Sequence, residues 1–167
     1  DRHFSDYVLS EILHHQPKEI QNFLVDTACL LRLNADLCDF IRETNDSQTT
    51  LDYLFQSNLF LNPLDKDHRW FRYHDMFRES LLNKLRIKQA ARFISLQKRA
   101  VSWLIEHEQA HEAIEQVVQL EDWVLLVELL EENGNNLIHE GHHLLMLEWL
   151  GKVPEKLFSQ SPRVIML

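Results

Sequence analysis

Apolar residues recur at helical spacing along almost the whole 167-residue chain, and the exception, between residues 59 and 73, is the feature that most constrains the fold. Spacings of three and four residues predict helices on both sides of this segment. Before it, one helix ends near His14, a second opens at Pro17, and two more span 35–43 and 48–56. After it, the predicted helices span 75–88, 91–107, 110–119, 122–140 and 142–151, and another opens near Pro162.

Several residues are suited to begin these helices. Pro17 fits the first helical position, where its missing N–H costs no hydrogen bond. Asn34 is the expected N-cap of the third helix, and Asp46 or Ser47 that of the fourth, because their side-chain oxygens accept from free backbone N–H groups.

The exceptional segment predicts a β-hairpin. Two short, aromatic-rich runs, 59–64 and 69–73, flank the polar turn Asp65-Lys66-Asp67-His68. Pro63 cannot donate to a central ladder, so its strand should lie at an edge. A lone hairpin is marginal in water and must pack on neighbouring helices, which predicts a winged-helix domain.

The sequence after the hairpin favours antiparallel helix pairs. Short links at Glu108, Leu120 and Gly141 are typical of an α-solenoid. Apolar residues lie roughly where tetratricopeptide-type repeats place their packing residues, namely Leu96, Ala100, Leu104, Ala113, Ile114 and Val117. The predicted fold class is therefore mainly α, with a winged-helix domain over 1–88 and the start of a tetratricopeptide-like helical-repeat domain over 89–167.

Charge is segregated along the chain. The net charge of −9 argues against a broadly basic surface for wrapping nucleic acid. Residues 65–99 nevertheless hold ten Lys and Arg against four acids, a local balance of +6, whereas residues 100–151 hold eleven acids and no Lys or Arg. These two blocks can attract one another or face different neighbours.

Cysteines and hydropathy bear on the compartment. Cys29 and Cys38 lie among apolar residues and are too few for a disulfide framework, so we expect reduced, buried thiols and a cytoplasmic protein. No apolar run approaches the roughly 18 residues of a membrane span. The chain starts without a signal pattern and ends in the apolar run Val164-Ile165-Met166-Leu167, and we expect it to be part of a longer protein.

The string His139-Glu140-Gly141-His142-His143 matches H-E-x-x-H, in which two His on one helix bind zinc and the Glu activates water. This match makes a zinc-dependent hydrolase one alternative. Gly141, however, lies where the helix-pair pattern requires a turn, which would place His139 and His143 on different elements. We therefore expect neither a metal site nor a catalytic residue here.

A winged helix often reads DNA through the helix before the wing. That helix, 48–56, carries Asp52 and follows Asp46, and it has no Lys or Arg for phosphate contacts. We expect no direct nucleic-acid contact by this part of the chain. His74 is a different candidate, because it follows the second strand beside a helix N-terminus that Asp75 can cap, where phosphate is attracted.

The sequence resembles the MalT-like, ATP-dependent LuxR-type regulators, which belong to the signal-transduction ATPases with numerous domains. His74 ends the most specific part of the likeness. The residues that carry the resemblance are Leu59-Phe60-Leu61, Trp70-Phe71-Arg72-Tyr73-His74, Phe77, Leu81, Glu112-Ala113-Ile114, Trp149-Leu150 and Pro154.

The resemblance implies a regulatory segment of a transcriptional activator. In that family an upstream nucleotide-binding domain of the same chain binds ADP or ATP with Mg²⁺, and a helix-turn-helix module binds promoters. His74 would touch the β-phosphate of ADP and hold the resting state. A small-molecule or protein inducer would act on the helical repeats and favour a self-associating form. Asp75 departs from the residue that MalT-like members often carry after the His.

The chain itself contains no G-x-x-x-x-G-K-[ST] phosphate loop, so it is expected neither to hold a cofactor alone nor to be an enzyme. A second alternative is a helical-repeat interaction scaffold without any link to a nucleotide.

Overall fold

The computed structural model describes residues 2–158 and, within them, the side chains of residues 6–157. Its contacts group into two compact units, Asp1–Trp103 and Leu104–Leu167, and each is described by itself. The division falls inside one helix, and the domain boundary predicted at 88/89 stays a prediction. The helix predicted near Pro162 lies outside the described residues.

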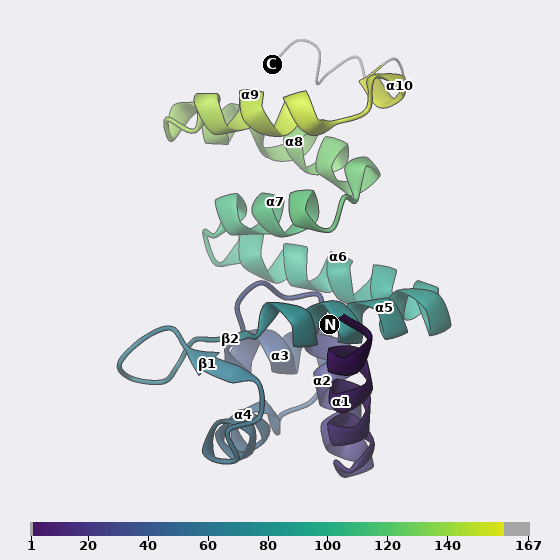
Figure 1. Ribbon diagram of the computed structural model, residues 1–167. Helices are drawn as coiled ribbons and strands as arrows, with labels where there is room; N and C mark the ends of the chain where they lie inside the picture. The colour runs from purple at the N-terminus through teal and green to yellow at the C-terminus, as the bar shows by residue number, and fades with distance from the viewer. Residues whose placement is uncertain (1, 159–167) are drawn as a thin grey trace. The chain divides into compact units, whose positions relative to one another are not determined.

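The first unit contains six helices and one hairpin among its described residues (Figure 1). Its elements are α1 (Arg2–His14), α2 (Lys18–Thr27), α3 (Ala35–Arg42), α4 (Ser47–Gln56), β1 (Leu61–Pro63), β2 (Phe71–Tyr73), α5 (Asp75–Lys88) and α6 (Ala90–Glu106), whose last turn belongs to the second unit. This order, helices interrupted once by a hairpin, confirms the predicted winged-helix fold class.

The hairpin is antiparallel and pairs Leu61 with Tyr73 and Pro63 with Phe71. Leu64 N donates to Trp70 O at 2.8 Å, so the neighbouring Pro63 occupies a position that needs no N–H toward β2. The predicted edge placement of Pro63 is therefore confirmed. On the other side of β2, Leu33 exchanges two backbone hydrogen bonds with Phe71, each 2.8 Å long.

The core of the first unit lies between the helices and the inner face of the hairpin. The Tyr73 hydroxyl is 2.7 Å from Thr27 Oγ1, which also donates to Phe23 O at 2.8 Å. Burial raises the pKa of Tyr73. Cys29 and Cys38 are buried and unpaired, as predicted, and burial raises the pKa of the Cys29 thiol to about 12.

The N-cap positions agree with the sequence prediction for α3 and α4 and differ for α2. Asn34 Oδ1 accepts from Leu37 N at 2.7 Å, which confirms the predicted N-cap. Asp46 is the N-cap residue of α4, one of the two predicted, but its side chain makes no cap bond, and Asp39 Oδ1 accepts from Ser47 N at 3.0 Å instead. Pro17 precedes α2 as its N-cap residue rather than being its first helical residue.

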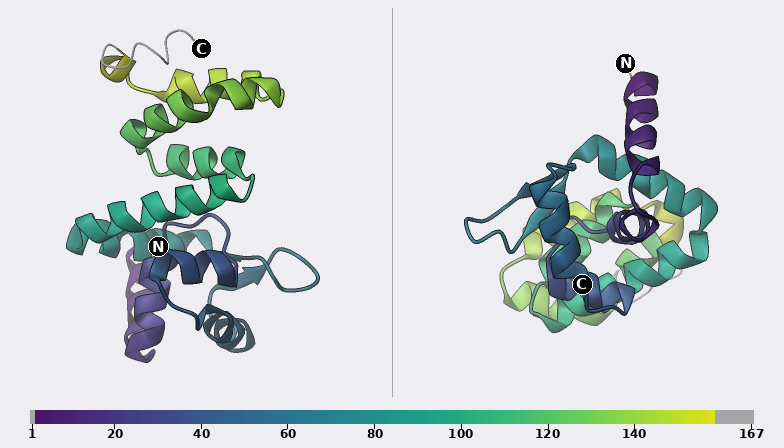
Figure 2. Two further views of the ribbon diagram at one scale, coloured as in Figure 1. Left: turned by 180° about the vertical axis from the view of Figure 1, so that it is seen from behind. Right: turned by 90° about the horizontal axis from the view of Figure 1, so that it is seen from below.

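The second unit continues after α6 with α7 (Ala110–Gln119), α8 (Trp123–His139), α9 (His143–Lys152) and the short α10 (Glu155–Phe158). Helices α7, α8 and α9 are stacked in chain order (Figures 1 and 2). The predicted links at Glu108 and Gly141 are confirmed, and the third shifts by one residue, from Leu120 to Glu121. These three residues are left-handed, with φ of 59°, 88° and 55°.

Each of these links closes with the same pair of backbone bonds. After α7, for example, Glu121 N donates to Val118 O at 3.0 Å and Asp122 N donates to Val117 O at 3.1 Å. This is the Schellman pattern, which satisfies the last carbonyls of a helix and reverses the chain. Two of the three links use Glu rather than Gly, although an L side chain in this conformation is strained.

Candidate functional site

His74 lies where β2 leads into α5. Its N–H donates to Phe60 O at 3.0 Å, and its carbonyl accepts from Arg78 N at 2.9 Å. These bonds fix the backbone of His74 at the N-cap position, with φ −57° and ψ 136°, while the side chain is exposed.

Aromatic side chains support the imidazole from one side. The Phe60 ring meets the His74 ring edge to face at 6.4 Å and stacks on Phe77 at 4.2 Å between ring centroids. Phe77 is buried and lies 5.9 Å from the buried Tyr73 ring. The ring next to His74 is therefore anchored to the core, and the face of His74 away from Phe60 is left to solvent.

Asp75 does not cap α5, contrary to the expectation from sequence. The N-cap position belongs to His74, whose own side chain makes no cap hydrogen bond. Asp75 is the first helical residue, and its carboxylate accepts from Arg72 Nη2 at 2.7 Å. Among the described side chains, none accepts from the N–H groups of the first turn of α5, which suits an anion.

Arg78, one turn into α5, has a structural role. Its Nε and Nη2 donate to Leu30 O and Cys29 O at 3.1 and 3.2 Å. Burial lowers the pKa of this guanidinium. Because Arg78 ties the start of α5 to the segment after α2, it is not available to an external phosphate.

The helix before the hairpin is α4, as predicted. Its sequence supplies no Lys or Arg, so the element that would enter a major groove brings no phosphate contact.

The chain is therefore expected not to shift duplex DNA at physiological salt. The helix that would enter the major groove, α4, supplies no cation, and the second unit is acidic, so the phosphate contacts that dominate DNA affinity are lacking at these places. Electrophoretic shift with random and promoter DNA measures this. Binding tighter than about 1 µM would mean that the winged helix contacts DNA and that this expectation is wrong.

The H-E-x-x-H string is split by the fold. Helix α8 ends at His139 and α9 begins at His143, with Gly141 between them at φ 88°. The predicted separation of the two His is confirmed, and the unbroken helix that the zinc signature requires is not formed. Within the described part of the chain, no three His, Cys, Asp or Glu side chains group as a metal site would.

We expect purified protein to retain far less than one zinc per chain after dialysis, because His139 and His143 cannot share one helical face. Metal analysis of wild type beside His139→Ala and His143→Ala variants provides the comparison. One tightly held zinc that either substitution removes would restore the hydrolase alternative.

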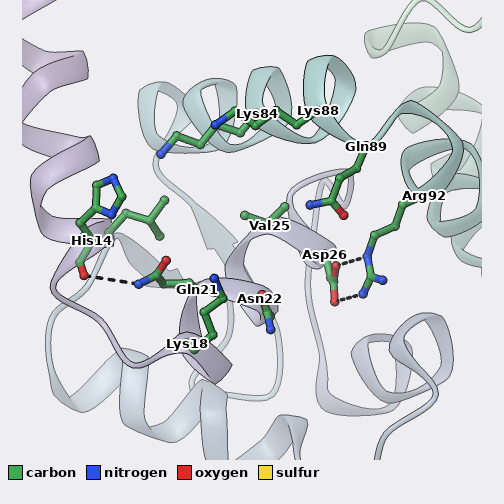
Figure 3. A pocket seen from close by; sticks show the side chains of 11 residues that line it. His14, Lys18, Gln21, Asn22, Val25, Asp26, Lys84, Lys88, Gln89 and Arg92 are labelled. Atoms are coloured by element: carbon green, nitrogen blue, oxygen red, sulfur yellow. Dashed lines mark hydrogen bonds and ion pairs between the residues drawn. The ribbon is translucent and has the colours of Figure 1, made fainter.

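The structure also brings together residues that no sequence spacing had singled out. Lys18 on α2 and the pair Lys84 and Lys88 on α5 line one pocket of the first unit, together with Asp26 and Arg92 (Figure 3). Only the fold joins them, since α2 and α5 are about sixty residues apart in sequence.

Comparison with known proteins gives a consistent result. A family model described as the MalT winged helix domain matches residues 9–93. Curated proteins named HTH-type transcriptional regulator MalT are similar along 99% of the chain: 28% identical in Vibrio parahaemolyticus, 27% in Vibrio campbellii and 26% in Serratia proteamaculans.

The matched region is a small part of those relatives, because the chain spans 18% of the length of each. The family match begins in α1 and ends in α6, and it includes the hairpin and His74. Among the described residues, no helix is both long and apolar enough to cross a membrane.

Proposed function

Since the chain belongs to the MalT winged helix domain family, we propose that it is a regulatory segment of a MalT-like, ATP-dependent transcriptional activator. Relatives bearing the name of such a regulator match nearly all of the chain, and they are far longer, which leaves room for a nucleotide-binding domain and a promoter-binding module elsewhere. A cytoplasmic location is part of this proposal.

His74 is the residue that we assign to nucleotide sensing. An exposed imidazole at the uncapped start of α5 supports this assignment, because a helix N-terminus and a donor N–H both favour a phosphate oxygen. In this proposal His74 contacts ADP held by the upstream domain of the same chain. Mg²⁺ and the phosphate loop would come from that domain, which carries the ATPase chemistry.

The contact would act as a latch through differential affinity. A bond from His74 to ADP forms only when the winged helix rests against the nucleotide, so it stabilises that closed state alone. An inducer that binds the helical repeats better in the open state shifts the population toward ATP binding and self-association.

The second unit is the proposed site of inducer sensing and self-association. Its helices present exposed apolar side chains, among them Leu144 and Leu147 on α9, beside a surface rich in acids. The same observation supports the alternative of a protein-interaction scaffold without a nucleotide link.

The test is ADP affinity and basal reporter transcription in the full-length protein, for wild type and for His74→Ala. His15→Ala is the matched control, since His15 is an exposed imidazole at the end of α1, outside the proposed contact. Looser ADP and higher basal output in His74→Ala alone support the latch. Unchanged values in a folded His74→Ala protein favour the scaffold.

A further inference from the structure

A second feature of the winged-helix unit lies at the other end of α5. A pocket of about 350 Å³ opens between the end of α1, one side of α2 and the last turns of α5. Figure 3 shows Lys84 and Lys88 along α5 on one side, and Lys18 and Gln21 on the other. This volume is at the lower end of the range for small-molecule sites.

The lining is strongly cationic. Lys18, Lys84, Lys88 and Arg92 face it, against the single carboxylate of Asp26. The Asp26 carboxylate is already paired with two arginines. Arg92 donates to both of its oxygens at 2.7 Å, and Arg42 Nε lies 3.6 Å from its Oδ2.

The three lysines lack a counter-ion among the described side chains. Among the side chains described for residues 6–157, none forms an ion pair with Lys18, Lys84 or Lys88 within 4.0 Å. Asp6 lines the adjoining hollow with Lys84 and Lys88 but stays outside that distance. Partial burial and, after it, the charge of Lys88 lower the pKa of Lys84, and a bound anion would favour its charged form.

We propose that this pocket binds a small phosphate-bearing anion, held by Lys18, Lys84 and Lys88. Ammonium groups from two facing helices supply charge from both sides, and the amides of Asn22 and Gln89 add neutral donors. The enclosure between helices and the chain's net charge of −9 favour a small ligand over a long polyanion.

The pocket is separate from the His74 latch. Lys84 lies on α5 ten residues after His74, the N-cap of that helix, which corresponds to a rise of about 15 Å. Binding there would act on α1, α2 and α5 together, and so on the framework of the winged helix rather than on the His74 contact.

The experiment is calorimetric titration of the 167-residue chain with inorganic pyrophosphate and, separately, ribose 5-phosphate. Wild type is compared with Lys84→Gln/Lys88→Gln and with Lys18→Gln, which changes the opposite wall. Glutamine has nearly the same helix propensity as lysine, so the variants should keep the fold. Circular dichroism of each variant checks its helix content. Lys66→Gln/Lys98→Gln removes the same charge from exposed sites outside the pocket.

We expect saturable binding by wild type, weakened by roughly 10-fold or more in Lys84→Gln/Lys88→Gln and also weakened in Lys18→Gln, with little change in Lys66→Gln/Lys98→Gln. Equal affinity for both probes would indicate that the ligand is a free phosphate anion. Tighter binding of ribose 5-phosphate would indicate that the ligand is a phosphorylated metabolite. No binding up to about 10 mM, or equal weakening in Lys66→Gln/Lys98→Gln, would overturn the site. Tighter binding of duplex DNA through the same lysines would overturn the choice of a small ligand.

Discussion

Replacing Asp26 with alanine is expected to lower the free energy of unfolding by about 3 kcal/mol or more. Its carboxylate joins three helices of the first unit, since Asp26 is on α2, Arg42 on α3 and Arg92 on α6. The side chains of Asp26 and Arg42 are only 6% and 11% exposed. Asp26→Ala therefore leaves the nearly buried Arg42 guanidinium, among the described side chains, with only the exposed Asp46, 3.3 Å from its Nη1, as a counter-ion. Removing one partner of a buried ion pair in this way is strongly destabilising.

The chain supplies a control that differs mainly in burial. Arg72 and Asp75 form an ion pair with the same N–O distance of 2.7 Å as Arg92 and Asp26, but their side chains are 54% and 76% exposed. Asp75→Ala should cost about 1 kcal/mol or less, because water screens the pair. Chemical denaturation of both variants gives the comparison, and equal losses would show that the Asp26 cluster contributes no more than a surface pair.

Most of the secondary structure could be predicted because it follows from local patterns. Helix α5 has the bounds predicted for 75–88, and α7 those predicted for 110–119. Apolar spacing defines such helices, and Asn34 and Gly141 mark local starts and turns that depend on neighbouring residues alone. The hairpin strands are three residues each, shorter than the predicted runs, although the bonds from Leu64 N to Trp70 O and from His74 N to Phe60 O continue the pairing beyond the strand ends.

Features that depend on distant residues could not be predicted. Asp39 takes the capping role expected of Asp46 because α3 and α4 pack together, which places its carboxylate at Ser47 N. Leu33 pairs with Phe71 as an isolated bridge and has no strand pattern to signal it. Both interactions are products of tertiary packing, which local propensity does not contain.

The candidate site shows the same division. The position of His74 between a strand and a helix was readable from sequence, because the change of period marks the junction. Asp75 was misjudged by one position: the N-cap is the residue just before the helix, which is His74, and the helix already includes Asp75. The lysine pocket had no signal, since its walls meet only in the folded unit.

In the full-length protein, His74→Ala is expected to weaken ADP binding by roughly 10-fold to 150-fold and to raise transcription without inducer. A hydrogen bond to a charged group contributes about 1.5–3 kcal/mol, and the loss of that free energy corresponds to the expected fall in ADP affinity. The latch stabilises the closed state only, so its loss should leave ATP-driven activation intact. Isothermal titration with ADP and a promoter reporter measure the two effects.

His74→Asn separates the phosphate contact from structural support. Asn is among the preferred N-cap residues, and this end of α5 has no side-chain cap, so the variant should gain up to about 1 kcal/mol of stability. Its amide is shorter than the imidazole and engaged with the α5 backbone, so ADP should still be bound more weakly than by wild type. If His74→Asn retains wild-type ADP affinity and basal transcription, the imidazole makes no contact with the nucleotide and the latch is wrong.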